Sequence, residues 1–223
     1  MLFTAVAMTA CGEPGNIYLP LHSDQTLTYD VSRTRSGESS REKMLLRVAG
    51  PATIEGHEVY RAFSASGVQQ LLQAGERGIF EVGYRTPDEV IFFNQPSLLL
   101  PQPLAAGSQW QAPITTHLLD WRKHSLEKAG RQYQNTFTGQ FECETLNATI
   151  ETPAGTFSNV ARITGRGDKT IDYGSLQEQA VIHIELTRWY APDVGLIKSQ
   201  RREYADSREF NPGEATRVLE RID

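Results

Sequence analysis

A two-residue alternation of apolar and polar side chains runs through most of this chain, and it limits the possible folds more than any other feature. The segment AVIHIELT, residues 180–187, and the segment TFTGQFEC, residues 136–143, both place apolar or small side chains mainly at every second position. Such alternation is typical of a strand with one buried face and one wet face. No strand–helix–strand rhythm occurs, so we do not expect a parallel α/β sheet. The pattern therefore predicts an antiparallel β protein.

The number and spacing of these segments define the expected architecture. We predict a mainly β fold, a single curved antiparallel sheet forming an open barrel or a sandwich of about 10–13 strands, with at most one or two short helices. Residues 117–131 are the one plausible helix, although they could equally be a strand and a loop. Residues 95–110 contain too much proline for a central strand, and we expect an ordered crossing segment there. We assign residues 17–223 to one antiparallel domain.

Composition excludes several function classes. The chain has 223 residues, and its 27 acidic and 22 basic side chains give a net charge of −5. A basic surface is the footprint of nucleic-acid binding, so we expect no nucleic-acid partner. Only two cysteines occur, which excludes a disulfide framework and a zinc site built from several cysteines.

The first fifteen residues, MLFTAVAMTACGEPG, differ from the rest of the chain in being almost free of charge. Residues 2–8 form a minimal apolar core of an export signal, and small residues precede Cys11. Met8-Thr9-Ala10-Cys11 resembles a lipobox, the bacterial lipoprotein signal, with Met and Thr in place of the usual Leu and Ala or Ser. No Lys or Arg precedes the apolar core, so we expect the true start to lie upstream. The alternative is an uncleaved tail with an incidental buried cysteine.

If the signal is cleaved at Cys11, residues 1–16 are a signal remnant and a tether. Acylation of Cys11 would then supply two or three acyl chains, and stable anchoring needs at least two such signals. The expected partner is therefore a membrane, contacted through acylated Cys11. Gly12 follows the cysteine, and this resembles the pattern that sorts lipoproteins to the outer membrane.

Candidate catalytic groups are few. The chain contains no nucleophile elbow, zinc-binding HExxH motif, phosphate-binding loop or CxxC pair, so we predict neither an enzyme nor a cofactor. His117 and His124 lie seven residues apart but lack a matching carboxylate, so we assign no metal site. Cys143 lies on the apolar face of its strand, which indicates a buried structural thiol. Basic residues near the C-terminus, Arg201 and Arg202 among them, look like a mixed solvated face together with the glutamates around them.

Three segments resemble one group of proteins. TRWYAPDVGLIKSQ, residues 187–200, resembles the Trp-Tyr-Ala-Pro-Gly-Val-Gly-Leu-Val-Lys signature of uncharacterised bacterial envelope lipoproteins, with Asp193 in place of Gly and Ile197 in place of Val. The segment YLPLHSDQTLTYDV, residues 18–31, is similar to the opening of that group. LPQPLAAGSQW, residues 100–110, and TPAGTFSNVARI, residues 152–163, resemble its middle. The resemblance implies a curved sheet similar to the lipoprotein carriers LolA and LolB, located on the periplasmic face of the bacterial envelope and anchored in the outer membrane.

Two functions from different classes follow. The first is a non-catalytic binding module that holds a lipid, an acyl chain or a hydrophobic peptide on a concave sheet face. The second is a structural or assembly lipoprotein that contacts an envelope protein partner through a sheet edge or face; an envelope hydrolase is a weaker third possibility. The candidate wall residues, which could equally be core residues, are Trp110, Trp121, Trp189 and Tyr190.

Overall fold

The protein is built from β-strands throughout the part that the computed structural model describes, which is residues 17–21, 25–64, 67–121, 136–173 and 178–223. No helix occurs in these ranges, and the result confirms the predicted mainly β, antiparallel fold. The strands are β1 (Thr26–Arg35), β2 (Glu38–Ile54), β3 (His57–Ser64), β4 (Gln69–Gly75), β5 (Gly78–Arg85), β6 (Val90–Pro101), β7 (Gln109–Thr115), β8 (Asp120–Trp121), β9 (Thr136–Thr152), β10 (Gly155–Tyr173), β11 (Glu178–Ala191), β12 (Gly195–Ala205), β13 (Phe210–Asn211) and β14 (Gly213–Ile222).

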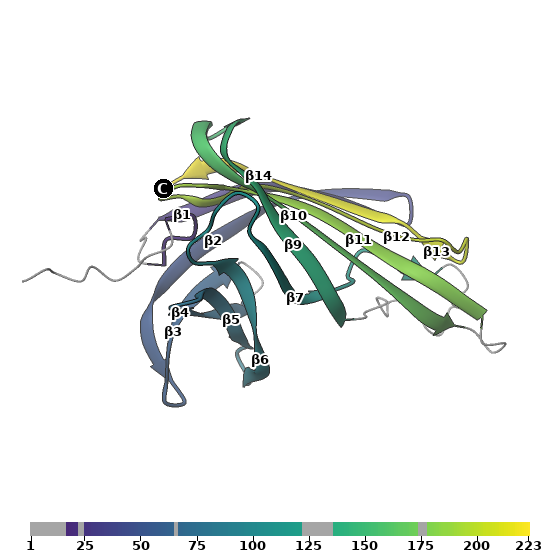
Figure 1. The fold of residues 1–223 in the computed structure, drawn as a ribbon, viewed down its shortest axis with the longest axis horizontal. Coiled ribbons are helices and arrows are strands. Elements are labelled where there is room, and N and C mark those ends of the chain that lie inside the picture. The colour runs from purple at the N-terminus through teal and green to yellow at the C-terminus, as the bar shows by residue number, and fades with distance from the viewer. Residues whose placement is uncertain (1–16, 22–24, 65–66, 122–135, 174–177) are drawn as a thin grey trace, which may run out of the picture.

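Twelve of the strands form one antiparallel sheet that curves until it nearly closes into a barrel (Figure 1). The strand order is β6-β5-β4-β3-β2-β1-β14-β12-β11-β10-β9-β7, so that β1 pairs with β14 and joins the two halves of the chain. The two edge strands, β6 and β7, approach each other. The remaining strands, β8 and β13, form a separate two-stranded sheet.

β-Bulges explain how so long a sheet can curve. The register shifts between Ala49 and Ala52 where β2 pairs with β3, between Trp189 and Tyr190 where β11 pairs with β12, and repeatedly between Phe157 and Ile163 in β10. A bulge bends its strand and increases the local twist. These irregular positions, which simple alternation does not reveal, therefore contribute to the curvature of the sheet.

Two local predictions need correction. Residues 95–101 are not a crossing segment, because they continue β6 through Pro96 and Pro101. Proline is tolerated there since β6 is an edge strand, whose outer side needs no ladder hydrogen bonds. For residues 117–131 the helix is wrong, and the alternative of a strand and a loop holds in the described residues: His117–Leu119 have no regular structure and Asp120–Trp121 form β8. Residues 122–135, like residues 1–16 with Cys11, lie outside the described part.

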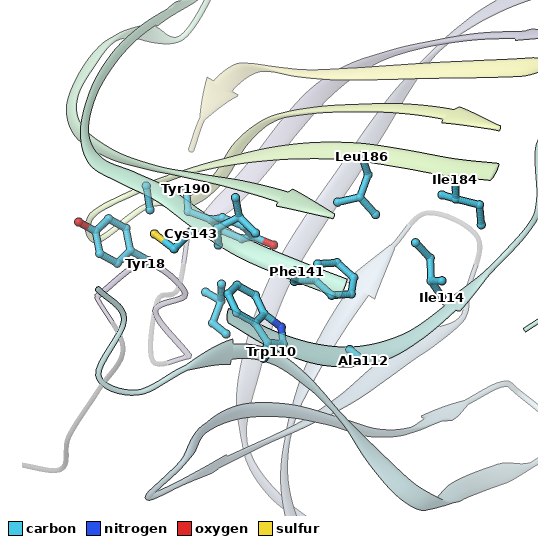
Figure 2. Close-up of a cluster of buried hydrophobic side chains, with 12 residues drawn as sticks. Tyr18, Trp110, Ala112, Ile114, Phe141, Cys143, Ile184, Leu186 and Tyr190 are labelled. Atoms are coloured by element: carbon cyan, nitrogen blue, oxygen red, sulfur yellow. The ribbon is translucent and has the colours of Figure 1, made fainter. Parts of the chain in front are cut away.

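The largest core cluster lies on the inner side of β7, β9, β10 and β11 (Figure 2). Trp110 stacks on Phe141 with the ring centroids 5.7 Å apart. The Phe141 ring lies directly on Gly165, where an added Cβ would come within 2.7 Å of the ring. Cys143 is completely buried in this cluster, and burial raises the pKa of its thiol. The prediction of a buried structural thiol is therefore confirmed.

The segment that precedes β1 contacts the turn between β11 and β12. The backbone N–H of Asp193, in the β11–β12 turn, donates a 2.7 Å hydrogen bond to the carbonyl of Ile17. Asp193 has a φ of 60°, a left-handed conformation that Asp tolerates better than most residues and Gly adopts freely. The turn therefore requires a residue that tolerates a positive φ at position 193. Residues 17–21 are thereby held against the turn, and Leu19 reaches the interior of the sheet.

Candidate functional site

A cavity of about 380 Å³ lies between the two walls of the curved sheet. One wall is formed by β1, β14, β12 and β11, and the other by β2 to β6. Its volume falls within the range of roughly 300–1,000 Å³ that is usual for small-molecule sites. The curvature of the sheet therefore leaves interior space that the chain's own side chains do not fill.

Apolar side chains from both walls line much of this cavity. They come from seven strands and from the segment that precedes β1, and they are Leu19, Val31, Leu46, Val48, Ala62, Leu72, Leu99, Leu186, Tyr190 and Leu196. A surface of this kind can hold hydrocarbon, since its removal from water is favourable at about 25 cal/mol per Å² of apolar area.

Four arginines also line the cavity, and they follow a regular zigzag across four adjacent strands. Arg188 of β11 and Arg217 of β14 both pair with Ser199 of β12, which places them on one row of the sheet. Arg201 of β12 and Arg33 of β1 both pair with Ala215 of β14, which places them on the next row. All four guanidinium groups therefore belong to one inward-facing band.

The band divides into paired and unpaired arginines. Arg33 forms an ion pair with Glu42, and Nε of Arg201 is 2.7 Å from a carboxylate oxygen of Glu203. Neither Arg188 nor Arg217 forms an ion pair with any carboxylate of the described residues. Instead, Arg188 lies over the Phe141 ring and Arg217 over the Tyr29 ring, at 5.9 and 5.6 Å from the centroids.

Arg217 also has a hydrogen-bond donor without an acceptor. Its Nε is buried and has no hydrogen-bond partner in the structure. Burial lowers the pKa of this guanidinium, and the nearby charge of Arg188 acts in the same direction. Arginine stays protonated at any physiological pH, so the site keeps this positive charge.

At the Glu203 end of the cavity, by contrast, the buried carboxylate has several hydrogen-bond partners. The completely buried carboxylate of Glu203 accepts hydrogen bonds from the backbone N–H groups of His117, Leu118 and Leu119, at 2.9–3.1 Å. Together with Arg201, these three donors hold the segment that follows β7 across the sheet. His117 lines the cavity, so this segment forms its end wall.

Close packing seals the same end. A Cβ added to Gly213 would lie 2.4 Å from the carbonyl oxygen of Leu118, so glycine is required where β14 meets the segment. Burial lowers the pKa of His117, and the charge of Arg201 acts in the same direction. The Glu203 end is thus a structural closure.

Glu81 is the only carboxylate among the described residues that line the cavity. It projects from β5, on the wall opposite the arginine band. Burial raises the pKa of Glu81, while the charge of Arg188 and a 3.4 Å hydrogen bond from Gln70 partly offset that rise. Because Arg33 and Arg201 are paired with Glu42 and Glu203, the surplus of positive charge in the cavity comes from Arg188 and Arg217, which face one lining carboxylate.

The structure separates the four candidate aromatic residues. Tyr190 lines the cavity. Trp110 and Trp189 are buried in core clusters and do not line it. Trp121 lies in β8, paired with Phe210, but its side chain is outside the described part. Their role as ligand-contacting walls stays a prediction, now with Tyr190 as its best-placed member.

The arginine band escaped sequence reasoning. The interpretation of Arg201 and its neighbouring glutamates as a solvated face is wrong for Arg201 and Glu203, because the Arg201 side chain is only 15% exposed and Glu203 is completely buried. A signal was present in the alternation: Arg188 follows Ile184 and Leu186 at the same two-residue spacing. A charged residue that occupies an apolar position of an alternating strand is informative.

A second hollow, of about 630 Å³, lies on the outer face of β10, β11, β12 and β14 and is open to solvent. On this face Nδ1 of His183 is 2.5 Å from a carboxylate oxygen of Asp168, and Tyr204 donates a 3.0 Å hydrogen bond to Glu185. No serine or cysteine is among its described lining residues. The contact therefore lacks the usual nucleophiles of a hydrolytic triad, although threonine hydroxyls are nearby. Within the described ranges, no three His, Cys, Asp or Glu side chains are grouped to hold a metal ion.

Comparisons with known proteins give two structural likenesses. A protein from Bacteroides fragilis, described as exported and with a YmcC-like fold, is 14% identical with a TM-score of 0.44, covering 93% of this chain and 99% of the other. A protein from Parabacteroides distasonis, described as a lipoprotein, is 13% identical with a TM-score of 0.40, covering 94% and 99%. No protein-family model matches the chain, and no curated protein does.

These likenesses are too distant to carry a function, so the function is argued from the cavity itself. The described part contains no helix with the length and apolar character needed to span a membrane.

Proposed function

We propose that this chain is a non-catalytic binding module that holds a lipid, an acyl chain or a hydrophobic peptide in the cavity of its curved sheet. The observation that carries the proposal is the apolar-lined cavity of about 380 Å³ between the two walls. A chain that acted only as a compact scaffold would gain stability by filling such a space, since each buried methylene contributes about 0.8 kcal/mol.

We further propose that Cys11 is acylated and anchors the domain in the bacterial outer membrane, on its periplasmic face. Residues 2–10 and Cys11 support this proposal through their likeness to a lipoprotein signal. A membrane anchor would keep the cavity close to a supply of acyl chains.

The alternative of an assembly protein has less support. Three large apolar side chains of the described residues are exposed, namely Ile17, Leu45 and Val68, and they belong to three different segments. So sparse a set gives little apolar area for a protein partner, whereas the cavity gathers apolar side chains from both walls.

Native mass spectrometry of envelope-purified protein tests both proposals together. We expect a mass that begins at Cys11 with added acyl groups, and a co-purifying hydrophobic ligand. A mature mass that lacks acyl groups and retains residues 1–10 would contradict anchoring.

A matched pair of variants tests whether a ligand occupies the cavity. Ala215 lines the cavity, so Ala215→Leu would fill part of the space, whereas Ala74 is exposed in β4 and Ala74→Leu would not. We expect Ala215→Leu alone to lose the ligand. Equal ligand retention by both variants would contradict binding in the cavity.

A further inference from the structure

The arginine band gives the cavity a second property besides its apolar lining. A site for uncharged hydrocarbon has no use for buried cations, because moving a charge out of water costs several kcal/mol even after relaxation. Buried charges are normally paired with an opposite charge. Arg188 and Arg217 are half-buried, and Nε of Arg217 is fully buried, so their lack of a carboxylate partner among the described residues calls for an explanation.

Arg33 forms an ion pair with Glu42, and Arg201 forms one with Glu203, so neither needs a further explanation. Arg188 and Arg217 face the cavity without such a partner, and Nε of Arg217 is buried without any hydrogen bond. The two lie on one row of the sheet, separated by the short side chain of Ser199. Two strand spacings of about 4.8 Å place their Cα atoms roughly 10 Å apart. Two long side chains at that separation can both reach one small acidic group.

Apolar side chains border this pair inside the same cavity. Tyr190, which follows Arg188 by two residues, and Leu196 lie along the wall on one side, and Leu72 and Leu99 come from the opposite wall. The far end, beyond Arg201, is closed by the segment held on Glu203. The cavity therefore combines a cationic region with an adjoining apolar region.

We propose that the ligand is a single-chain amphiphile with an acidic head group, a carboxylate or a phosphate, and that Arg188 and Arg217 bind the head group while the apolar lining holds the chain. The planar guanidinium fork suits carboxylate and phosphate oxygens, and bonds between charged groups are the stronger hydrogen bonds in proteins. An acidic head group would give Nε of Arg217 the acceptor that the chain itself does not supply. This inference rests on the proposed function and specifies its ligand class.

Calorimetric titration of the full chain with three probes tests the proposal. Decanoate carries both the chain and the acidic head group, decan-1-ol carries the chain alone, and acetate carries the acidic group alone; the long-chain probes are used below their solubility and micelle limits. We expect decanoate to bind at least about tenfold more tightly than decan-1-ol, because only decanoate forms charge-assisted hydrogen bonds. Acetate should bind far more weakly than either.

The outcomes separate this inference from the proposed function. Equal affinity for decanoate and decan-1-ol would overturn the acidic head group and leave the hydrophobic binding module intact. No binding of either long-chain probe would overturn the amphiphile and, within the proposed function, the binding of acyl chains. Acetate binding as tight as that of decanoate would overturn the amphiphile in favour of a small-anion site.

Variants locate the head group. Arg188→Met and Arg217→Met keep most of the side-chain length and remove the charge, so each should bring the affinity for decanoate close to that for decan-1-ol. Arg202 follows Arg201 on β12 but lies on the outer hollow, which makes Arg202→Met the charge-matched control with unchanged affinity. Thermal unfolding confirms that each variant is folded. Unchanged decanoate affinity in both Arg188→Met and Arg217→Met would contradict the proposed position.

Discussion

Two regions of the cavity both contain arginines of the band, but the arginines have different partners. At the Glu203 end, a completely buried carboxylate has Arg201 and three backbone N–H groups as partners. In the middle of the cavity, Arg188 and Arg217 have aromatic rings beneath them but no carboxylate within ion-pair distance among the described residues. The comparison teaches that burial alone does not mark a functional group. The buried charge of Glu203, which the chain satisfies, holds the fold together, whereas the half-buried charges of Arg188 and Arg217, which have no carboxylate partner among the described residues, are available to a ligand.

Removal of Glu203 should have the largest effect on stability. Glu203→Ala leaves Arg201 and three backbone donors without their acceptor, and breaking a buried ion pair in this way costs about 3–5 kcal/mol. Urea unfolding followed by circular dichroism measures the loss. Glu220→Ala, at a glutamate on the exposed face of β14, is the control. A loss below about 1 kcal/mol in Glu203→Ala would show that this end is not a structural closure.

The next largest effect should be a difference in stability between removing a paired arginine and removing an unpaired one. Arg201→Met should lower the free energy of unfolding by about 1–3 kcal/mol, because Glu203 loses a charged donor but keeps its three backbone donors. Arg217→Met should be neutral or stabilising, because it removes a cation whose Nε is buried without a partner. The same urea titration compares them in the absence of added ligand. Equal losses in both variants would remove the distinction between the two regions.

Substitution of Glu81 should change the free energy of unfolding by a smaller amount that depends on pH. Its pKa in the folded protein is raised above the ordinary 4.5, so from pH 4.5 upward the folded state retains a proton that the unfolded state has released. Stability due to this group therefore falls as the pH rises through that window. Glu81→Gln abolishes the titration, so the variant should gain stability relative to the original chain between pH 4.5 and pH 7. Unfolding free energies measured at both pH values check the sign, and a relative gain on acidification instead would contradict it.

Breaking the ion pair between Lys43 and Glu220 on the surface should have the smallest effect on stability. Nζ of Lys43 is 2.5 Å from a carboxylate oxygen of Glu220, but the two side chains are 55% and 37% exposed. Exposed ion pairs contribute about 0–1 kcal/mol, so Lys43→Met should change the free energy of unfolding by no more than that. Thermal unfolding at low and at 0.5 M salt, an ionic strength that screens such pairs strongly, should show little difference between variant and original. A loss comparable to that of Arg201→Met would show that exposure does not distinguish these pairs.

The sequence by itself determined the class of fold, because strand periodicity is local and is repeated in many segments. Segments such as residues 180–187 show which side chains face inward without reference to any partner strand. The buried environment of Cys143 followed from the same pattern. Edge position, in contrast, is decided by pairing, and for this reason the proline-containing residues 95–101 could form a strand that the composition seemed to forbid.

Only the tertiary structure decided the site. Arg33, Arg188, Arg201 and Arg217 are separated by up to 184 residues (217 − 33), and the strand order places them on four adjacent strands. Bulges, whose positions no simple alternation shows, curve the sheet until its opposite walls enclose a cavity. Whether an arginine is paired depends on which strand lies beside it, and Glu203 lies near Arg201 but not near Arg217. The pairing of distant strands therefore decides which arginine has a carboxylate partner and which faces the cavity without one. The local sequence cannot show this, because it does not specify which strands become neighbours.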